Sequence, residues 1–302
     1  MRGVRNRLRR IRAARADLQA AVFATRAETA ALSAALAALD ARVSAQHERT
    51  MQALRIVRDD DARARAKLLH LRTTPDYEAA FEETEPLVTI IIPTYTNWQQ
   101  LRERALPSVL AQTYERFECL VIGDAAPAES AQAVDSFSDE RLRFINLPYR
   151  GPYPPELKDA WMVVGTAPFN AGLELASGRW FAALDDDDAL SPRHVELLLA
   201  LAKAERAEVP YGRIDRHEPG GKTTVFGTHP PQLGQWNLQC SLFHAGLRFM
   251  TLQPTDWLFG IPNDWSLAER MLRIGVRFAM TEESVVDYYP SVFWTDQPER
   301  ML

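Results

Sequence analysis

The sequence predicts an α/β domain with a mainly parallel sheet, preceded by a long N-terminal helix. From residue 87 onward, β-branched runs alternate with segments of helical spacing, as in chains that build a parallel sheet with flanking helices. Residues 4–70 instead contain no proline or glycine and are rich in alanine, leucine and arginine, which favour a helix. With 302 residues, 46% apolar and 25% charged, the chain has room for both parts and has the composition of an ordinary globular protein.

Charge is distributed unevenly along the chain. Residues 1–86 hold 16 basic and 12 acidic residues, and the remainder holds 19 and 28. This asymmetry predicts two parts with different roles, and the overall charge of −5 gives no sign of a nucleic-acid-binding protein. We expect a helical extension at 1–72, a proline-containing acidic linker at 73–86, and a catalytic domain at 87–302.

Apolar residues of the N-terminal part follow a seven-residue repeat. Of 17 positions in two sets, 11 are Ala, Val, Leu or Ile, which predicts a coiled coil that is most regular between Leu18 and Val43. The first set is Val4, Ile11, Leu18, Thr25, Leu32, Leu39, Gln46, Ala53 and Asp60, and the second is Leu8, Arg15, Val22, Thr29, Leu36, Val43, Thr50 and Val57.

A helix with such a seam needs a partner. We expect another copy of the same helix and therefore a homo-oligomer; the alternative is that the helix folds back on its own catalytic domain. Seven arginines among the first 15 residues form a solvated helix face, or alternatively touch anionic lipid at a membrane surface.

In the C-terminal part, strands are expected at 87–95, 117–124, 141–147 and 179–184, with a strand pair at 209–216 and 222–227. Helices are expected at 98–113, 167–178 and 191–204, with Gly178 as a C-cap. In open α/β sheets, ligands bind beyond the carboxyl ends of the strands. Tyr95, Asp124 and the aspartates that follow residue 184 all stand at such ends.

The stretch 180-WFAALDDDDALSP-192 places four aspartates directly after a buried strand. On an extended segment, Asp185 and Asp187 would share one side and Asp186 and Asp188 the other. Such carboxylates repel one another, and Mg²⁺ or Mn²⁺, which prefer oxygen ligands, would relieve the repulsion. The alternative is an acidic solvated turn ahead of the next helix.

Residues 87–200 resemble the nucleotide-sugar-binding half of the inverting family 2 glycosyltransferases, which have the GT-A fold. The matching segments are 89-TIIIPTY-95, 108-SVLAQTYERFECLVIGDA-125 and 170-NAGLELASGRWFAALDDDD-188, together with Pro192. The sequence departs from the family pattern in two places, since Thr96 precedes Asn97 and Gly123 replaces the first of two aspartates. The resemblance divides the domain into a nucleotide-sugar half, 87–205, and an acceptor half, 206–302.

The resemblance implies roles for individual residues. Pro93, Thr94 and Tyr95 would contact the nucleoside, and Asp124 would bond the base, which is usually uracil in the family. Asp185 and Asp187 match the Asp-x-Asp motif that contacts the ribose and the metal-bound diphosphate, with Asp187 and Asp185 as the ligands of the divalent cation. The matched segments also make Asn170 and Asp186 candidates for nucleotide-sugar binding.

The acceptor half carries the family layout at 263-NDWSLAERMLRIGVRFAMTEESVVDYYPS-291. Asp264 matches the catalytic aspartate that takes the proton of the acceptor hydroxyl; the alternative is a helix N-cap. Asp256 is the second candidate for the base.

Together with these residues, the resemblance implies an inverting, metal-dependent, non-processive transfer of a sugar from a nucleoside diphosphate donor, with UDP as the expected nucleotide. The acceptor would be a glycan, a lipid-linked sugar or a protein. A nucleotidyltransferase and a non-catalytic oligomeric scaffold are the alternatives. We expect a cytoplasmic protein, since both cysteines lie in apolar surroundings, with peripheral membrane contact as a variant of that location.

Overall fold

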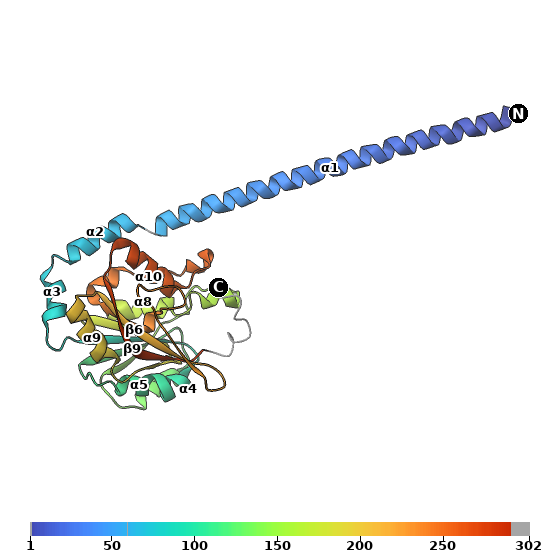
Figure 1. Ribbon diagram of the computed structural model, residues 1–302. Coiled ribbons are helices and arrows are strands. Elements are labelled where there is room, and N and C mark those ends of the chain that lie inside the picture. The colour runs from blue at the N-terminus through green and yellow to red at the C-terminus, as the bar shows by residue number, and fades with distance from the viewer. Residues whose placement is uncertain (1, 59, 291–302) are drawn as a thin grey trace. The chain divides into compact units, whose positions relative to one another are not determined.

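The structure is a computed structural model that describes residues 2–58 and 60–290 (Figure 1). The chain divides into two compact units, Met1–Asp59 and Asp60–Leu302. Each unit is considered separately below.

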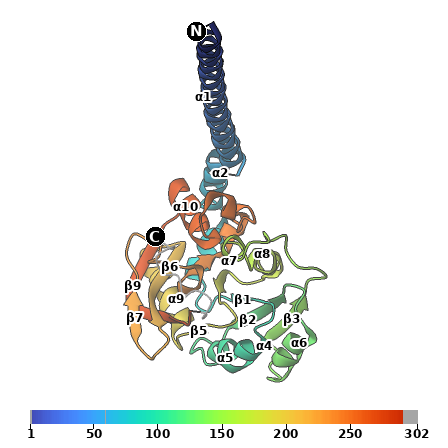
Figure 2. The same ribbon diagram turned by 90° about the vertical axis from the view of Figure 1, so that its right-hand side faces the viewer.

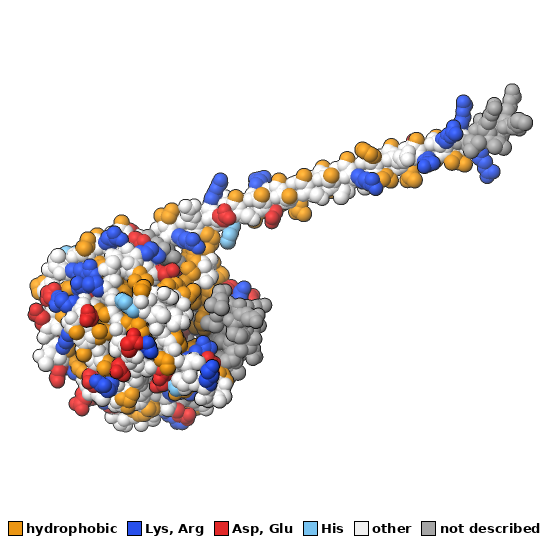
Figure 3. All heavy atoms as spheres, in the orientation of Figure 1, with side chains coloured by type: hydrophobic (Ala, Val, Ile, Leu, Met, Phe, Trp, Pro, Cys, Tyr) orange, Lys and Arg blue, Asp and Glu red, His pale blue; other side chains and the backbone are white. Residues whose placement is uncertain are grey.

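The first unit is one helix, α1 (Arg2–Arg58), as the run without proline or glycine predicts. Where the structure describes its side chains, all are exposed except Met51, which is half-buried. Hydrophobic side chains recur along its length in Figure 3. By length and composition alone, an 18-residue window within Arg9–Leu71 is apolar enough to cross a membrane, a property shared with signal sequences and with core helices of soluble proteins.

The second unit is built on a five-stranded sheet with the order β3-β2-β1-β4-β8. Its members are β1 (Val88–Thr94), β2 (Phe117–Gly123), β3 (Leu142–Asn146), β4 (Trp180–Ala183) and β8 (Leu242–His244). The first four are parallel to their neighbours, and β8 is antiparallel to β4. The predicted, mainly parallel sheet is therefore confirmed, and every residue of β4 is buried, as its continuous apolar run indicates.

Helices cover both faces of this sheet. Figure 2 shows α8 (Thr166–Leu175) on one face and α5 (Leu106–Leu110) and α6 (Ala128–Asp135) on the other. The helix predicted at 98–113 is interrupted, because α4 (Trp98–Gln100) continues as a π-helical turn, η1 (Leu101–Ala105), before α5 begins. The short α7 (Leu157–Trp161) precedes α8.

A second sheet has the order β5-β9-β6-β7. The predicted pair of strands is confirmed, since β6 (Val209–His217) pairs antiparallel with β7 (Thr223–Phe226). The other two strands are β5 (Ala189–Leu190) and β9 (Phe278–Tyr288), the latter parallel to β6. Helix α9 (His194–Glu205) packs against β6 and β9 of this sheet, and helix α10 (Asn263–Ile274) packs against α2 (Asp61–Leu71). Short 3₁₀ turns occur at η2 (Leu238–Cys240), η3 (Ala245–Phe249) and η4 (Asp256–Phe259).

Residues 73–86 differ from the predicted linker. They contain helix α3 (Pro75–Glu82), capped by Thr74, whose side chain accepts a hydrogen bond from the Tyr77 backbone N–H. Tyr77 and Phe81 are buried, and Phe81 makes an edge contact with Trp180 at 5.4 Å between ring centroids. The acidic residues that suggest a linker are not buried: Asp76, Glu82 and Glu85 are exposed, and Glu78 and Glu83 are half-buried. The break between the two units instead lies at Asp59 and Asp60, and α2 (Asp61–Leu71) belongs to the second unit.

Gly178 also differs from its predicted role. Helix α8 ends at Leu175 with Ala176 as its C-cap, so Gly178 is not the cap. A Cβ atom at position 178 would lie 2.7 Å from the backbone nitrogen of Thr89. Glycine is needed there because the chain entering β4 passes directly against β1.

Candidate active site

Three strands of the first sheet end at the same edge. Thr94 at the end of β1 pairs with Gly123 at the end of β2, and Ile91 of β1 pairs with Ala183 at the end of β4. Tyr95, Asp124 and the aspartate run follow these strands directly, so the fold brings them to one edge, where α/β sheets bind ligands.

The four aspartates form a turn and do not continue the strand. The Asp188 backbone N–H donates to the carbonyl of Asp185 at 3.3 Å. The predicted alternation, with Asp186 and Asp188 on one side, is therefore wrong, because a turn reverses the chain and breaks the two-residue period. Asp185 and Asp188 face one common partner, and Asp186 faces another.

The common partner is Gln239 in η2, more than 50 residues along the chain. Its Nε2 donates to Asp185 Oδ2 at 2.8 Å and to Asp188 Oδ2 at 2.7 Å, and its Oε1 accepts from the Asp185 backbone N–H at 3.0 Å. The second oxygen of Asp188 accepts from the Tyr289 backbone N–H at 2.7 Å. One buried amide thus bridges both ends of the aspartate turn.

Asp186 points toward the loop after β1. It accepts from the Thr94 hydroxyl at 2.7 Å and from the Asn97 amide at 2.9 Å, and it is buried. Thr94 and Asp186, both candidates for nucleotide-sugar contact, are therefore hydrogen-bonded to each other. Their mutual bond ties the β1 loop to the aspartate turn.

The remaining member of the run, Asp187, lies beside an arginine of the π-helical turn. Arg104 donates to the backbone carbonyl of Asp187, and its guanidinium stacks over the Tyr289 ring at 3.7 Å from the centroid. Arg104 reaches Asp187 from a π-helical turn that lies between α4 and α5, and such turns often accompany functional sites.

Desolvation raises the pKa of all four carboxyls, and repulsion from neighbouring carboxylates adds to this for Asp185, Asp187 and Asp188. Asp185 keeps contact with solvent, yet the protein around it displaces much of its water; this desolvation, followed by repulsion from Asp187, Asp186 and Asp264, raises its pKa to about 8. Desolvation also raises the pKa of Asp187 to about 6, with repulsion from Asp186 adding to it. The pKa values of Asp186 and Asp188 are raised for the same first reason. Such a site favours a bound cation.

At the end of β2, Asp124 is held by the loop that follows β3. Its Oδ1 accepts from the Gly151 backbone N–H at 2.9 Å, and its Oδ2 accepts from the Tyr153 hydroxyl at 2.6 Å. The same loop places the Arg150 guanidinium 3.9 Å from the centroid of the Tyr95 ring. Both groups expected to hold the base, Asp124 and Tyr95, are thus engaged by one short segment of the chain.

Asn170 and Pro93 are less directly placed for ligand contact. The Asn170 side chain donates to the carbonyl of Leu252 at 2.9 Å and accepts from its N–H at 3.1 Å, which fixes α8 to the segment before η4. Pro93 is half-buried, and the loop at Gly165 lies against it.

Asp264 lies in the first turn of α10, close enough to Asp185 for the two charges to interact. The N-cap of this helix is Pro262, so Asp264 is not the cap; its Oδ1 accepts from the Trp265 backbone N–H at 2.6 Å. Desolvation raises its pKa to about 6. Asp256 is 0% exposed, so only Asp264 of the two candidates has access to solvent.

The neighbour of Asp264 links α10 to the loop that holds Asp124. The Asn263 backbone N–H donates to the carbonyl of Met162 at 2.8 Å, and its side chain donates to the Thr166 hydroxyl at 2.8 Å. Residues 151–166 therefore contact the expected base-binding aspartate at one end and the helix of the expected catalytic aspartate at the other.

Within residues 2–58 and 60–290, no three His, Cys, Asp or Glu side chains are grouped to hold a metal ion by themselves. Asp185 and Asp187 supply carboxylate oxygens, the ligand type that Mg²⁺ and Mn²⁺ prefer. The residues therefore fit a cation that takes its other ligands from a bound diphosphate.

A model of a known family matches this part of the chain. The family is described as glycosyl transferase family 2, and the match covers residues 89–153 and 166–258, just over half of the chain. The chain belongs to glycosyl transferase family 2. Residues 154–165, around α7, lie between the two matched segments.

Curated relatives of this family 2 chain match over part of its length. The putative colanic acid biosynthesis glycosyl transferase WcaA of Escherichia coli K12 is 29% identical over 120 residues, covering 39% of this chain and 38% of the relative. The E. coli UDP-Glc:alpha-D-GlcNAc-diphosphoundecaprenol beta-1,3-glucosyltransferase WfgD is 30% identical over 129 residues, covering 43% and 46%. The matches thus span less than half of these relatives.

Solved structures support the fold. The crystal structure of S. aureus TarS 1-349 in complex with UDP-GlcNAc superimposes with a TM-score of 0.54 and 15% identity, covering 67% of this chain and 58% of that chain. This family 2 chain therefore has the GT-A fold that the resemblance predicts. The family matches give no support to the nucleotidyltransferase alternative.

The sequence reasoning missed Gln239, Tyr153 and Arg104. Gln239 lies in an aperiodic stretch and carries no motif that would indicate its role. The proline-rich segment at 148–168 was a signal that the loop near Tyr153 is unusual, but not of its contact with Asp124.

Proposed function

We propose that this family 2 chain transfers one sugar residue from a nucleoside diphosphate sugar to an acceptor hydroxyl, with inversion at the anomeric carbon. The observation that carries the proposal is the closeness of two acidic groups, the aspartate turn and the side chain of Asp264. The aspartate turn, at the ligand edge of the sheet, lies within electrostatic reach of Asp264 at the start of α10. A donor held by the first group would present its anomeric carbon toward the second.

The donor side uses the groups at the strand ends. Tyr95, 37% exposed, offers a ring face to the base, and Asp124 offers acceptors for its N–H groups. Asp187 and Asp185 would hold a divalent cation, which when bound stabilises the charge of the departing diphosphate. Gln239 and Arg104 keep the aspartate turn in place through its side chains and its Asp187 carbonyl.

On the acceptor side, Asp264 takes the proton from the attacking hydroxyl. Its pKa of about 6 suits this role, because the group is ionised near neutral pH yet basic enough to accept a proton in the transition state. The hydroxyl oxygen forms the new bond to the anomeric carbon as the bond to the diphosphate oxygen breaks. One such displacement inverts the configuration.

UDP is the proposed nucleotide, and the acceptor is a glycan, a lipid-linked sugar or a protein. The name of WfgD, which states UDP-Glc as donor and a diphosphoundecaprenol-linked sugar as acceptor, supports a UDP donor and makes a lipid-linked acceptor the first to test. A cytoplasmic or peripheral membrane location would give access to such an acceptor.

The test is a screen of UDP-, GDP- and dTDP-sugars for hydrolysis and transfer, with Mn²⁺, with Mg²⁺ and with excess EDTA. We expect turnover of a UDP-sugar that is lost in EDTA and in Asp187→Ala, while the far-ultraviolet circular dichroism of the variant stays unchanged. Full activity in EDTA would remove the metal from the proposal. Turnover of none of the donors, together with no thermal stabilisation by any nucleotide, would oppose the proposed function itself.

A further inference from the structure

The apolar seam of α1 has a defined shape. Seven aliphatic residues of the two heptad sets are 45–72% exposed: Ile11, Leu18, Val22, Leu32, Leu36, Leu39 and Val43. The seam has a shallow, open hollow where small side chains replace leucine, lined by Ala21, Val22, Thr25, Thr29 and Ala30 among others. The seam therefore has a hollow stretch near Val22–Thr29 and a raised stretch from Leu32 to Leu39.

The threonines of the hollow are prepared for apolar contact. The Thr25 hydroxyl donates to the Ala21 carbonyl at 3.0 Å, and the Thr29 hydroxyl donates to the Thr25 carbonyl at 2.8 Å. With their hydroxyls satisfied within the helix, both side chains can present their methyl groups to a partner without leaving a polar group unpaired.

A parallel pair of α1 helices would match each residue with itself. Thr25 would face the partner's Thr25, and Thr29 the partner's Thr29, so hollow would face hollow and leave a void in the core. Arg15 would face the partner's Arg15 within the seam, and the seven N-terminal arginines would lie beside those of the partner. Both arrangements are unfavourable, the first through lost packing and the second through repulsion between like charges.

An antiparallel pair matches one heptad set with the other. With nearly complete overlap of the two helices, the hollow receives the raised stretch, and every layer between Leu18 and Val43 contains Leu or Val. Arg15 faces a polar residue, the partner's Gln46. The other layers pair Leu18 with the partner's Val43, Val22 with the partner's Leu39, Thr25 with the partner's Leu36, and Thr29 with the partner's Leu32.

We propose that α1 pairs with the α1 of a second copy of this chain in an antiparallel, two-stranded coiled coil. The 57-residue helix rises about 85 Å at 1.5 Å per residue, so the C-terminal ends of the two α1 helices lie about that far apart. The pairing is independent of the chemistry proposed above.

Cysteine crosslinking of the full chain tests the orientation. Leu18→Cys and Val43→Cys are made separately with different affinity tags, and the native Cys119 and Cys240 are buried, so the parent chain serves as the background control. After co-refolding and mild oxidation, we expect at least tenfold more disulfide between the two variants than within either alone. Strong crosslinking of each variant with itself would show a parallel pair and overturn the proposal.

Light scattering of the unoxidised full chain tests the number of strands, with a dimer mass expected. Leu32→Asp should give monomers, whereas Ala34→Asp, which places the same charge outside both heptad sets, should leave the dimer intact. A monomeric parent, a trimer or tetramer, or a chain that requires detergent and inserts α1 into lipid vesicles would each overturn the proposal.

Discussion

At the scale of the residue, the structure separates the two candidates for the base. Asp264→Asn keeps the shape of the side chain and its contact with the Trp265 N–H but cannot take a proton. We expect the transfer rate to fall by roughly 10²–10⁴-fold, the usual worth of general base catalysis, with little change in the affinity for the nucleotide sugar. Asp256→Asn, at a position that is 0% exposed, should change stability more than rate. The reverse outcome would make Asp256 the base.

The raised pKa of Asp264 gives this residue a signature in the pH profile. Because the base must be ionised, kcat/KM should fall as the pH drops through about 6, by about tenfold per pH unit below it. Asp264→Asn should lack this acidic limb. If the variant and the parent share the same limb, another group controls it.

Tyr153 occupies one oxygen of Asp124, which the proposed function assigns to the nucleotide base. If the base replaces the Tyr153 hydroxyl there, Tyr153→Phe removes a competing hydrogen bond to a charged group. Such a bond is worth about 1.5 kcal/mol, so UDP should bind up to about tenfold more tightly to the variant in calorimetric titration. Tyr149→Phe, on an exposed tyrosine of the same loop, is the matched control. Weaker binding of UDP to Tyr153→Phe would show that Tyr153 itself contributes to holding the nucleotide base.

These residues also mark the limit of what the sequence predicts about the site. Asp124, Asp185, Asp187 and Asp264 follow from strand ends and family motifs, both of which are local patterns. Gln239 does not, because its contacts with Asp185 and Asp188 join segments more than 50 residues apart, and nothing local requires an amide at that position.

At the scale of the element, the four parallel strands of the first sheet, β1 to β4, follow the predicted ranges within about two residues, because a buried parallel strand needs a continuous apolar run. The antiparallel β8, with only three residues, is not predicted. Helix α3 is not predicted, because no long local pattern marks it. It has only eight residues, and its burial depends on Tyr77 and Phe81 reaching Trp180 and His244, which are distant in sequence.

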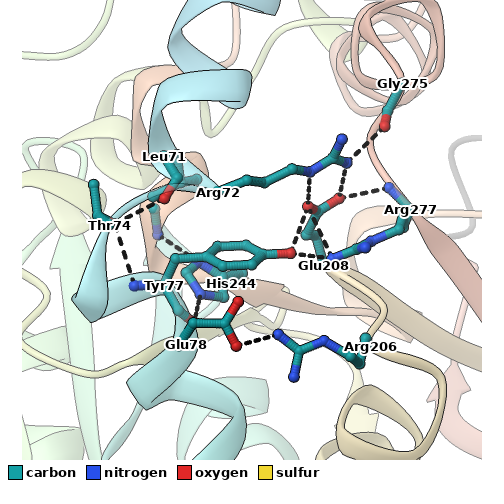
Figure 4. Close-up of polar contacts among 11 residues, drawn as sticks. Leu71, Arg72, Thr74, Tyr77, Glu78, Arg206, Glu208, His244, Gly275 and Arg277 are labelled. Atoms are coloured by element: carbon teal, nitrogen blue, oxygen red, sulfur yellow. Dashed lines mark hydrogen bonds and ion pairs between the residues drawn. The ribbon is translucent and has the colours of Figure 1, made fainter.

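Helices α2 and α3 are joined to the second sheet by a buried carboxylate (Figure 4). Glu208, 0% exposed, accepts from Arg72 Nε at 2.6 Å and Nη2 at 2.8 Å, from the Tyr77 hydroxyl at 2.9 Å and from the Arg277 backbone N–H at 2.7 Å. Burial acts to raise the pKa of Glu208, but the bonds from Arg72 and Arg277 outweigh it, and the pKa is lowered. The group is therefore held ionised inside the protein.

Removing Arg72 should leave this charge without its main partner. We expect Arg72→Ala to lower the free energy of unfolding by about 3 kcal/mol, as for other buried ion pairs that lose one member. Arg193→Ala, which breaks the exposed pair with Glu196, should cost less than about 1 kcal/mol. Urea denaturation monitored by tryptophan fluorescence measures both, and equal effects would show that the Glu208 contacts contribute no more than a surface pair.

At the scale of the whole molecule, the boundary between the two units decides which truncated chains can fold. Cutting at Asp60 removes only α1, whereas cutting at Leu87 also removes α2 and α3. The second cut takes away the buried side chains of Leu68, Tyr77 and Phe81, and it deprives the Trp180 indole of the Ala80 carbonyl that accepts its hydrogen bond at 3.0 Å.

We therefore expect the chain that starts at Asp60 to be soluble, cooperative in urea unfolding and monomeric by light scattering, while the full chain is dimeric. Burying a large apolar side chain contributes about 1.5–3 kcal/mol, so the loss of Leu68, Tyr77 and Phe81 alone approaches the total stability of a typical domain. The chain that starts at Leu87 should be insoluble or lack a cooperative transition. If it unfolds with the same midpoint as the chain that starts at Asp60, then residues 60–86 are dispensable for folding. The expected division into a helical extension to residue 72 and a linker at 73–86 would then describe them better than packed helices do.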